Sequence, residues 1–151
     1  MGFSAGGHLA TCCLTMFEDT FAEETNDEID ALSCRPDFGI LGYPVVAMSQ
    51  PYGHGGSKRR LLGENPPQDL VKRCDTALRV TDTTPPVFIV HSADDRAVPL
   101  QNALDFMAAC AEKKVPVTAH IYPTGGQGYG FSGRGDAEGW AARLAEWMEK
   151  R

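Results

Sequence analysis

The first seven residues constrain the fold of this chain more than any other stretch. Gly2, Ser4 and Gly6 form the pattern G-x-S-x-G, which is typical of a sharp strand-to-helix turn with a serine at its tip. The serine backbone in such a turn is strained, and its hydroxyl projects from the sheet. We expect the two flanking glycines to let strand and helix approach without a side-chain clash.

The residues after the serine fit the same turn. The backbone N–H of Ala5 would stand at the amino end of a helix, where it can donate to an oxyanion. A run of small and apolar residues predicts that helix over Gly6 to Met16. The alternative interpretation is a glycine-rich turn in which the serine is incidental.

Composition limits the class of protein. The chain has 151 residues, 42% hydrophobic and 23% charged, as expected for one globular domain. No apolar run has the length of a membrane span and no signal peptide is present, so we expect no membrane partner. The net charge of −6 argues against a nucleic-acid partner.

The negative charge is concentrated in one segment. Residues 17–30 contain seven acidic residues and no lysine or arginine, which leaves the rest of the chain at +1. The spacing matches no calcium-binding loop, so we interpret this segment as a solvated surface loop and not as a metal site.

The cysteines show no metal-ligand spacing: they are Cys12, Cys13, Cys34, Cys74 and Cys110. An odd number with two adjacent members argues against a disulfide framework, and we interpret them as buried small apolar residues. They favour a reducing compartment such as the cytoplasm. One disulfide bond remains an alternative. Secretion also remains an alternative if the true N-terminus is missing.

Apolar runs alternate with helical patterns, which predicts an α/β fold with a parallel sheet of about three strands. The strands are expected at 38–46, 87–91 and 116–122, and the later helices at 65–74, 100–114 and after residue 136. We expect Asn65 and Asp136 to cap two of these helices. The expected buried positions are Leu100, Leu104, Met107 and Ala111 in one helix and Trp140, Leu144 and Trp147 in the last.

Three loops follow the expected strands and should meet at one edge of the sheet, where ligands of parallel sheets bind. They carry Ser4, the pair Asp94 and Asp95, and Gln127. A serine becomes a good nucleophile when a base, itself oriented by a carboxylate, takes its proton. Two of these three parts are present, in the chain order that α/β-hydrolases use.

Five motifs occur in order along the chain. They are Gly2–Ala10, Arg35–Asp37 leading to Tyr43-Pro44-Val45, Leu61–Asn65, His91–Asp95 with Val98-Pro99, and Tyr122–Gly126. With these motifs the chain resembles the C-terminal half of α/β-hydrolases related to acetyl-xylan esterases and other carbohydrate esterases. The resemblance implies one partial α/β-hydrolase domain over residues 1–151 that starts at the nucleophile elbow. Prolyl-oligopeptidase-type peptidases share similar strand-end motifs and are the alternative family.

The resemblance also implies a reaction and its residues. The reaction is hydrolysis of an acetylated carbohydrate or other small ester through an acyl-enzyme, without cofactor or metal. Ser4 matches the nucleophile, and Asp95 matches the acid, because the family acid stands four residues after the strand-end histidine and two residues before a Val-Pro pair. Asp94 is then an acceptor of loop hydrogen bonds. We expect Asp95 to face Ser4 and the Gln127 loop.

Two departures from the family pattern bear on activity. The family carries its catalytic histidine in the Gly-rich loop, where this chain has Gln127, and the amide of glutamine is not a useful base. His54, in a long polar loop, is the alternative base. The chain also has no counterpart of the strands before the elbow, including the His-Gly-Gly segment that supplies a second oxyanion donor.

These departures leave the activity open between an esterase and an inactive remnant. Three strands alone would expose an unpaired sheet edge and an apolar face. We therefore expect the chain to be a fragment, the product of a shortened reading frame, or one part of an assembly with an N-terminal half or a second copy.

Overall fold

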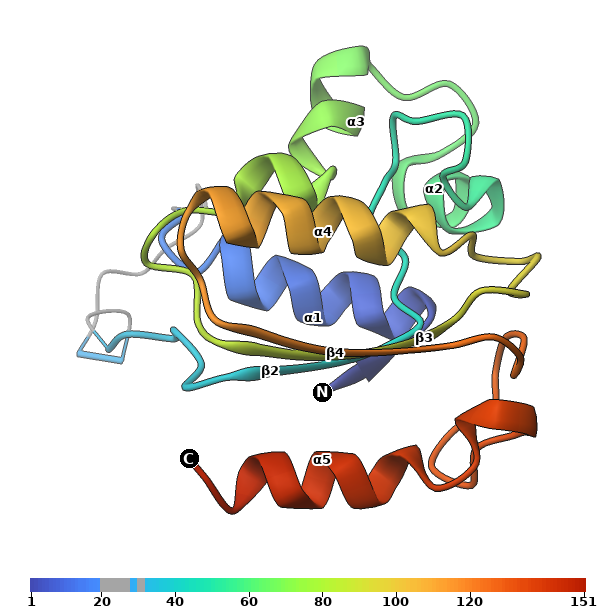
Figure 1. Cartoon of the computed structure of the whole chain (residues 1–151). Coiled ribbons are helices and arrows are strands. Elements are labelled where there is room, and N and C mark those ends of the chain that lie inside the picture. Colours follow the sequence, from blue (N-terminus) through green and yellow to red (C-terminus); the bar gives the residue numbers. More distant parts are fainter. Residues whose placement is uncertain (20–27, 30–31) are drawn as a thin grey trace.

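A computed structural model of the chain describes residues 1–19, 28–29 and 32–151. Most of the acidic segment at 17–30 therefore lies outside the described residues, and its interpretation as a surface loop stays a prediction. Strands and helices follow one another in this order (Figure 1): β1 (Gly2–Phe3), α1 (Ala5–Thr15), β2 (Gly39–Gly42), α2 (Gly55–Leu62), α3 (Gln68–Arg73), η1 (Thr76–Arg79), β3 (Val87–Ser92), α4 (Gln101–Glu112), β4 (Val117–Tyr122), η2 (Gly135–Ala137) and α5 (Trp140–Met148).

The predicted α/β fold with a parallel sheet is confirmed. Four parallel strands lie in the order β1-β2-β3-β4, and the strand beyond the three expected is the two-residue β1 that enters the elbow. Leu41 of β2 pairs with Gly2 on one side and with Ile89 of β3 on the other. Helices α1 and α4 cover one face of the sheet, and α5 covers the opposite face (Figure 1). No helix among the described residues is long and apolar enough to cross a membrane.

The two faces of the sheet bury separate apolar clusters. The cluster under α1 and α4 contains Leu14, Leu41, Ile89, Phe106 and Cys110 among others. The cluster under α5 includes Ile40, Phe88, Val90, Trp140, Leu144 and Trp147. The predicted buried face of the last helix is therefore confirmed.

The buried face of α4 differs from the prediction. Ala103, Phe106 and Cys110 are fully buried, whereas Leu104 is 39% exposed. Two apolar stripes with helical spacing compete on this helix, and the one with the large Phe106 ring faces the sheet. Asn102 fixes the same rotation, because its buried side-chain oxygen accepts hydrogen bonds of 3.0 Å from two backbone N–H groups after β2.

Two predicted helix caps are wrong. Helix α3 begins after Pro67 and not after Asn65, because a residue that precedes a proline is disfavoured in the α conformation. Helix α5 begins after Gly139, whose φ is 79°. Asp136 instead accepts hydrogen bonds from the N–H (3.1 Å) and the hydroxyl (2.7 Å) of Thr124.

The cysteines are free, but the expectation that they are buried holds fully only for Cys110. Cys12 and Cys74 are half-buried, and Cys13 and Cys34 are exposed. The buried side of α1, which faces the sheet, includes Thr11 and Leu14. Cys13 is exposed because it lies on the other side of this helix.

Candidate active site

Ser4 occupies the turn between β1 and α1. Its φ of 52° and ψ of −121° lie outside the regions that non-glycine residues prefer. Its N–H donates to the carbonyl of Gly42 (3.0 Å) and its carbonyl accepts from the N–H of Val45 (3.0 Å), so both sides of the turn are tied to the end of β2. The strained strand-to-helix turn predicted from G-x-S-x-G is present. The role of Ser4 as a nucleophile stays a prediction.

The close contact between elbow and sheet involves Gly2 and Gly7. A Cβ atom on Gly2 would lie 2.0 Å from the carbonyl oxygen of Gly6, and one on Gly7 would lie 2.7 Å from Cα of Pro44. A Cβ on Gly6 would meet nothing within 4 Å. The expectation that Gly6 is needed for close approach is therefore wrong: Gly6 is exposed, and the crowded position is the next one.

Ala5 is the first residue of α1 and is exposed. The first N–H groups of a helix have no acceptor within the helix, and the helix dipole favours negative charge near them. The Ala5 N–H therefore follows Ser4 directly at the amino end of α1, and its role as an oxyanion donor stays a prediction.

Asp95 lies in the loop after β3 with only 5% of its surface exposed. Its Oδ1 accepts hydrogen bonds from the N–H groups of Ala97 and Val98, both at 2.9 Å. Its Oδ2 is buried and has no hydrogen-bond partner among the described residues. One oxygen is thus anchored, while the other is free of hydrogen bonds, although Nε2 of His91 lies 3.5 Å from it. This oxygen can accept from an imidazole N–H.

His91, in β3, contacts the loop that carries Asp95. It is fully buried, its Nε2 donates to the carbonyl of Val98 (2.9 Å), and the same nitrogen lies 3.5 Å from Oδ2 of Asp95. Burial lowers the pKa of His91, against the opposing effects of the Val98 carbonyl and the Asp95 carboxylate. We therefore treat His91 as a neutral hydrogen-bond donor.

Asp94 makes the direct contact between the acid loop and the Gly-rich loop. Its Oδ1 accepts a hydrogen bond of 2.8 Å from the N–H of Gly126. We expected Asp95 to face this loop, so the structure differs there. The interpretation of Asp94 as an acceptor of loop hydrogen bonds is confirmed, whereas Asp95 as the acid stays a prediction supported by its free, buried oxygen.

Gln127 lies in the Gly-rich loop that follows β4 and is half-buried. Its Oε1 accepts from the N–H of Gly128 at 3.0 Å. Its Nε2 is buried and lacks a hydrogen-bond partner in the described part of the chain. The side chain is therefore held by its oxygen and turned away from solvent.

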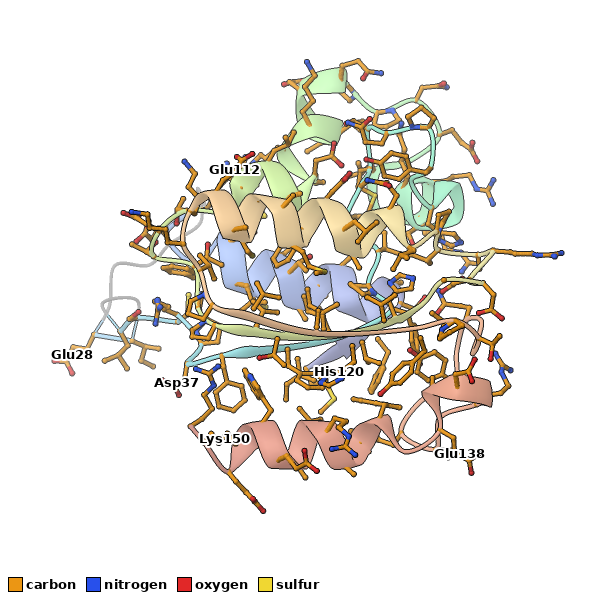
Figure 2. The ribbon with its side chains drawn as sticks, in the orientation of Figure 1. Glu28, Asp37, Glu112, His120, Glu138 and Lys150 are labelled. Atoms are coloured by element: carbon orange, nitrogen blue, oxygen red, sulfur yellow. The ribbon has the colours of Figure 1, made fainter. Side chains whose placement is uncertain are left out.

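The Gly-rich loop crosses to the ends of β1 and β2. The N–H of Gly130 donates to the hydroxyl of Tyr43 (2.9 Å), the residue directly after β2. The ring of Phe131 lies 5.5 Å from the ring of Phe3, the residue before Ser4. The structure therefore brings all three predicted loops to the carboxyl end of the sheet. This is the end at which Glu138 lies in Figure 2, opposite Asp37, which precedes β2.

The other histidines have local roles. His54 is the N-cap of α2, and its Nδ1 accepts from the N–H of Ser57 (3.2 Å) and contacts its hydroxyl oxygen (2.8 Å). His120 points from β4 toward α5 (Figure 2), with its ring 5.3 Å from that of Phe88. His8 donates from Nε2 to the carbonyl of Cys74 (2.8 Å).

Two residues of the site were not predicted. Tyr43 belongs to a quoted motif, but its φ of 37° and its hydrogen bond to the Gly-rich loop are tertiary features. Arg134 donates to two carbonyls of the same loop. No local pattern marks this arginine, because its partners are backbone atoms seven and nine residues earlier.

The relatives found by comparison with known proteins agree with one another. Residues 1–110 match the BD-FAE family. The chain is 36% identical over 141 residues to endo-1,4-beta-xylanase B of Butyrivibrio fibrisolvens and 34% identical over 135 residues to an acetylxylan esterase of Xylanibacter ruminicola. Its structure is similar to the acetyl ester-xyloside bifunctional hydrolase of Caldicellulosiruptor lactoaceticus, with a TM-score of 0.88 and 39% identity over 99% of this chain.

The chain spans only part of these relatives. It covers 22% of the xylanase, 25% of the esterase and 54% of the solved hydrolase, although 93%, 87% and 99% of the chain itself is matched. The matches support the resemblance to carbohydrate esterases over the one to prolyl-oligopeptidase-type peptidases.

Proposed function

The chain belongs to the BD-FAE family of α/β-hydrolases, an esterase family related to acetyl-xylan esterases, and from this premise we propose that it carries the nucleophile side of a carboxylic-ester hydrolase. The substrate class is an acetylated carbohydrate or another small ester. The chain forms part of an α/β-hydrolase domain, since it spans about half the length of the solved relative.

The observation that carries this proposal is the conformation of Ser4. A serine at φ 52° and ψ −121°, directly before the first residue of α1, is strained and held there by two backbone hydrogen bonds. Such strain persists where the surrounding structure enforces it, which is common at active sites. In an elbow of this kind the serine hydroxyl projects from the sheet and the N–H of the next residue, here Ala5, is the oxyanion donor.

The proposed reaction has two steps. Ser4 Oγ attacks the ester carbonyl, the Ala5 N–H donates to the oxyanion, and the alcohol leaves as an acyl-enzyme forms. Water then releases the acid. Each step needs a base that takes a proton from the attacking oxygen and returns it to the leaving oxygen, with Asp95 orienting that base. Position 127 is where the family resemblance places it.

The second candidate function is a catalytically silent relative of such esterases. The observation that favours it is Gln127, whose amide can donate and accept hydrogen bonds but cannot shuttle a proton at neutral pH. In this case the elbow is retained and the proton transfer is not. The second oxyanion donor would come from the part of the relatives that this chain does not span.

Labelling with a fluorophosphonate probe separates the two candidates. We expect slow labelling of Ser4 in the natural chain and none in Ser4→Ala, with both proteins folded by circular dichroism. Gln127→His should label faster than the natural chain, because a general base speeds the attack of Ser4, but only by a modest factor in the chain alone, where the second oxyanion donor is not supplied. A folded Gln127→His protein that labels no faster than Ser4→Ala would contradict the esterase proposal and support the silent relative.

A further inference from the structure

Two peptide units close to residue 127 are held by two charged side chains: the unit directly after it, and the unit that ends one residue before it. Between Gly125 and Gly126, the carbonyl accepts from Nε of Arg134 (2.9 Å) and the N–H donates to Oδ1 of Asp94 (2.8 Å). The other held unit joins Gln127 to Gly128, and its carbonyl, that of Gln127, accepts from Nη2 of Arg134 (2.7 Å). One arginine thus bridges two carbonyls, and one aspartate fixes the opposite edge of the first peptide.

The glycines of this loop leave its backbone direction weakly defined near residue 127. Gly126, Gly128 and Gly130 have φ values of 63°, 80° and 53°, and glycine loses more backbone freedom on folding than any other residue. Hydrogen bonds to a charged partner are about twice as strong as neutral ones. The held carbonyl of Gln127 orients the backbone after residue 127, and the held Gly125–Gly126 peptide limits the path of the chain before it.

We propose that Asp94 and Arg134 are positioning residues that aim the side chain of residue 127 at Ser4 and at the free oxygen of Asp95. The inference rests on the proposed function, because it assigns position 127 to the base. Its structural support is independent of that assignment. Buried polar atoms of these loops make no hydrogen bond among the described residues, and they include the donor Nε2 on residue 127, the acceptor Oδ2 of Asp95, and the hydroxyls of Ser92 and Tyr129.

Asp136 offers a matched control on the same loop. Its carboxylate also accepts a hydrogen bond from a backbone N–H, that of Thr124. It contacts neither of the two held peptide units near residue 127. Asp94→Ala and Asp136→Ala each remove one carboxylate with a backbone partner, so they differ in which peptide they release.

The first measurement is amide hydrogen exchange by NMR on the natural chain. Asp94→Ala should speed exchange at Gly126 by about tenfold, the factor for losing a hydrogen bond of about 1.4 kcal/mol. Asp94→Asn keeps an acceptor oxygen and should restore most of the protection. Asp136→Ala should leave Gly126 unchanged. Equal protection of Gly126 in Asp94→Ala and the natural chain would overturn the proposal.

The second measurement uses the Gln127→His background with p-nitrophenyl acetate. Adding Asp94→Ala should remove most of the gain in kcat that Gln127→His gives, with KM within twofold, because displacement of a base by about an ångström costs most of its effect. Arg134→Lys keeps the charge but loses the fixed fork of the guanidinium, and should lower kcat less than Arg134→Ala. An equal loss of kcat in Asp136→Ala would show a merely structural effect and overturn the proposal.

The 15N shifts of the introduced imidazole separate this inference from the proposed function. They report the tautomer of the ring and its hydrogen bond to Asp95, whether or not the protein hydrolyses an ester. We expect them to change with Asp94→Ala and not with Asp136→Ala. If Gln127→His is inactive but the shifts behave in this way, the proposed function fails while the positioning stands. If the 15N shifts do not change with Asp94→Ala, the proposal that Asp94 positions residue 127 is wrong.

Discussion

Ser4 carries strain that a purely structural turn would not need. Its positive φ of 52° costs on the order of 1–3 kcal/mol for a residue with a Cβ. We expect Ser4→Gly to raise the free energy of unfolding by about 1 kcal/mol in urea denaturation, after the loss of glycine's greater freedom in the unfolded chain. Ser4→Ala keeps the Cβ and should give no such gain, so equal stabilities of the two variants would contradict the strain.

The residues of the site differ in how far the sequence alone could place them. The elbow was predictable because its signal is local: one serine between small residues, followed at once by a helix. The division of roles between Asp94 and Asp95 depends on where each side chain points, and adjacent residues in a loop can point in unrelated directions. The sequence could suggest Asp94 as a loop acceptor, but its partner Gly126 is 32 residues away in the chain.

At the scale of one element, α1 contains two neighbouring glycines with opposite environments. A Cβ on Gly7 would lie 2.7 Å from Pro44, whereas a Cβ on Gly6 would meet nothing within 4 Å. We expect Gly7→Ala to destabilise the chain by about 1–3 kcal/mol through overpacking. Gly6→Ala should stabilise it by up to about 1 kcal/mol through helix propensity. Thermal unfolding of the two variants measures the difference, and a shift of the same sign in both would contradict this packing.

His8 couples α1 to the segment before η1. It is buried, its Nε2 donates to the carbonyl of Cys74, and burial lowers its pKa more than that carbonyl and Asp75 raise it. The unfolded chain then binds a proton near pH 6.5 that the folded chain resists. Stability from this group is present above pH 6.5 and falls as the pH drops below it.

The test is urea denaturation of the natural chain and His8→Gln between pH 7.5 and 5. We expect the natural chain to lose more stability over this range than His8→Gln, because the lowered pKa of His8 opposes protonation of the folded chain. His91 and His120 also have lowered pKa values because of burial and remain in both proteins, so the difference isolates His8. Parallel pH profiles would contradict the assignment.

The elements themselves were predictable where one apolar pattern had no competitor. Trp140, Leu144 and Trp147 form the only strong stripe on α5, and they are buried as expected. Helix α4 has two stripes of helical spacing, and the choice between them depends on the volume available beneath Phe106 and on partners for Asn102. Both are tertiary facts, as is the pairing of Asp136 with Thr124 in place of a cap on α5. The late start of α3, by contrast, follows from the local Pro66-Pro67 pair.

At the scale of the whole molecule, the sheet is covered unequally. Strand β1 has a partner only on its β2 side, and Leu9 on α1 is 67% exposed. An apolar groove of about 380 Å³ runs beside α1, lined in part by Cys12, Cys13, Met16, Leu61 and Leu62. The expected unpaired edge is therefore present at β1 among the described residues. A further strand beside β1 would cover that edge.

The segment that supplies the second oxyanion donor decides how large the effect of the base can be. We expect Gln127→His to raise p-nitrophenyl acetate hydrolysis by roughly a hundred- to ten-thousand-fold when both oxyanion donors are present. In the chain alone the gain should be modest, because loss of one oxyanion donor costs about a hundred- to a thousandfold in rate. The base and the second oxyanion donor both stabilise the same transition state. The full rate gain from either one is therefore measured only when the other is present.

Four proteins test this expectation. They are the chain and Gln127→His, each alone and each fused behind the part of the Caldicellulosiruptor lactoaceticus hydrolase that precedes its matched region. That hydrolase has nearly as much chain again beyond the region matched here, since 54% of it is covered. The fused Gln127→His protein should be by far the fastest of the four. Ser4→Ala in that fusion is the control, because it removes the nucleophile and leaves the imidazole. If the two fused proteins hydrolyse the ester at the same rate, residue 127 is not the base position, whatever the elbow does.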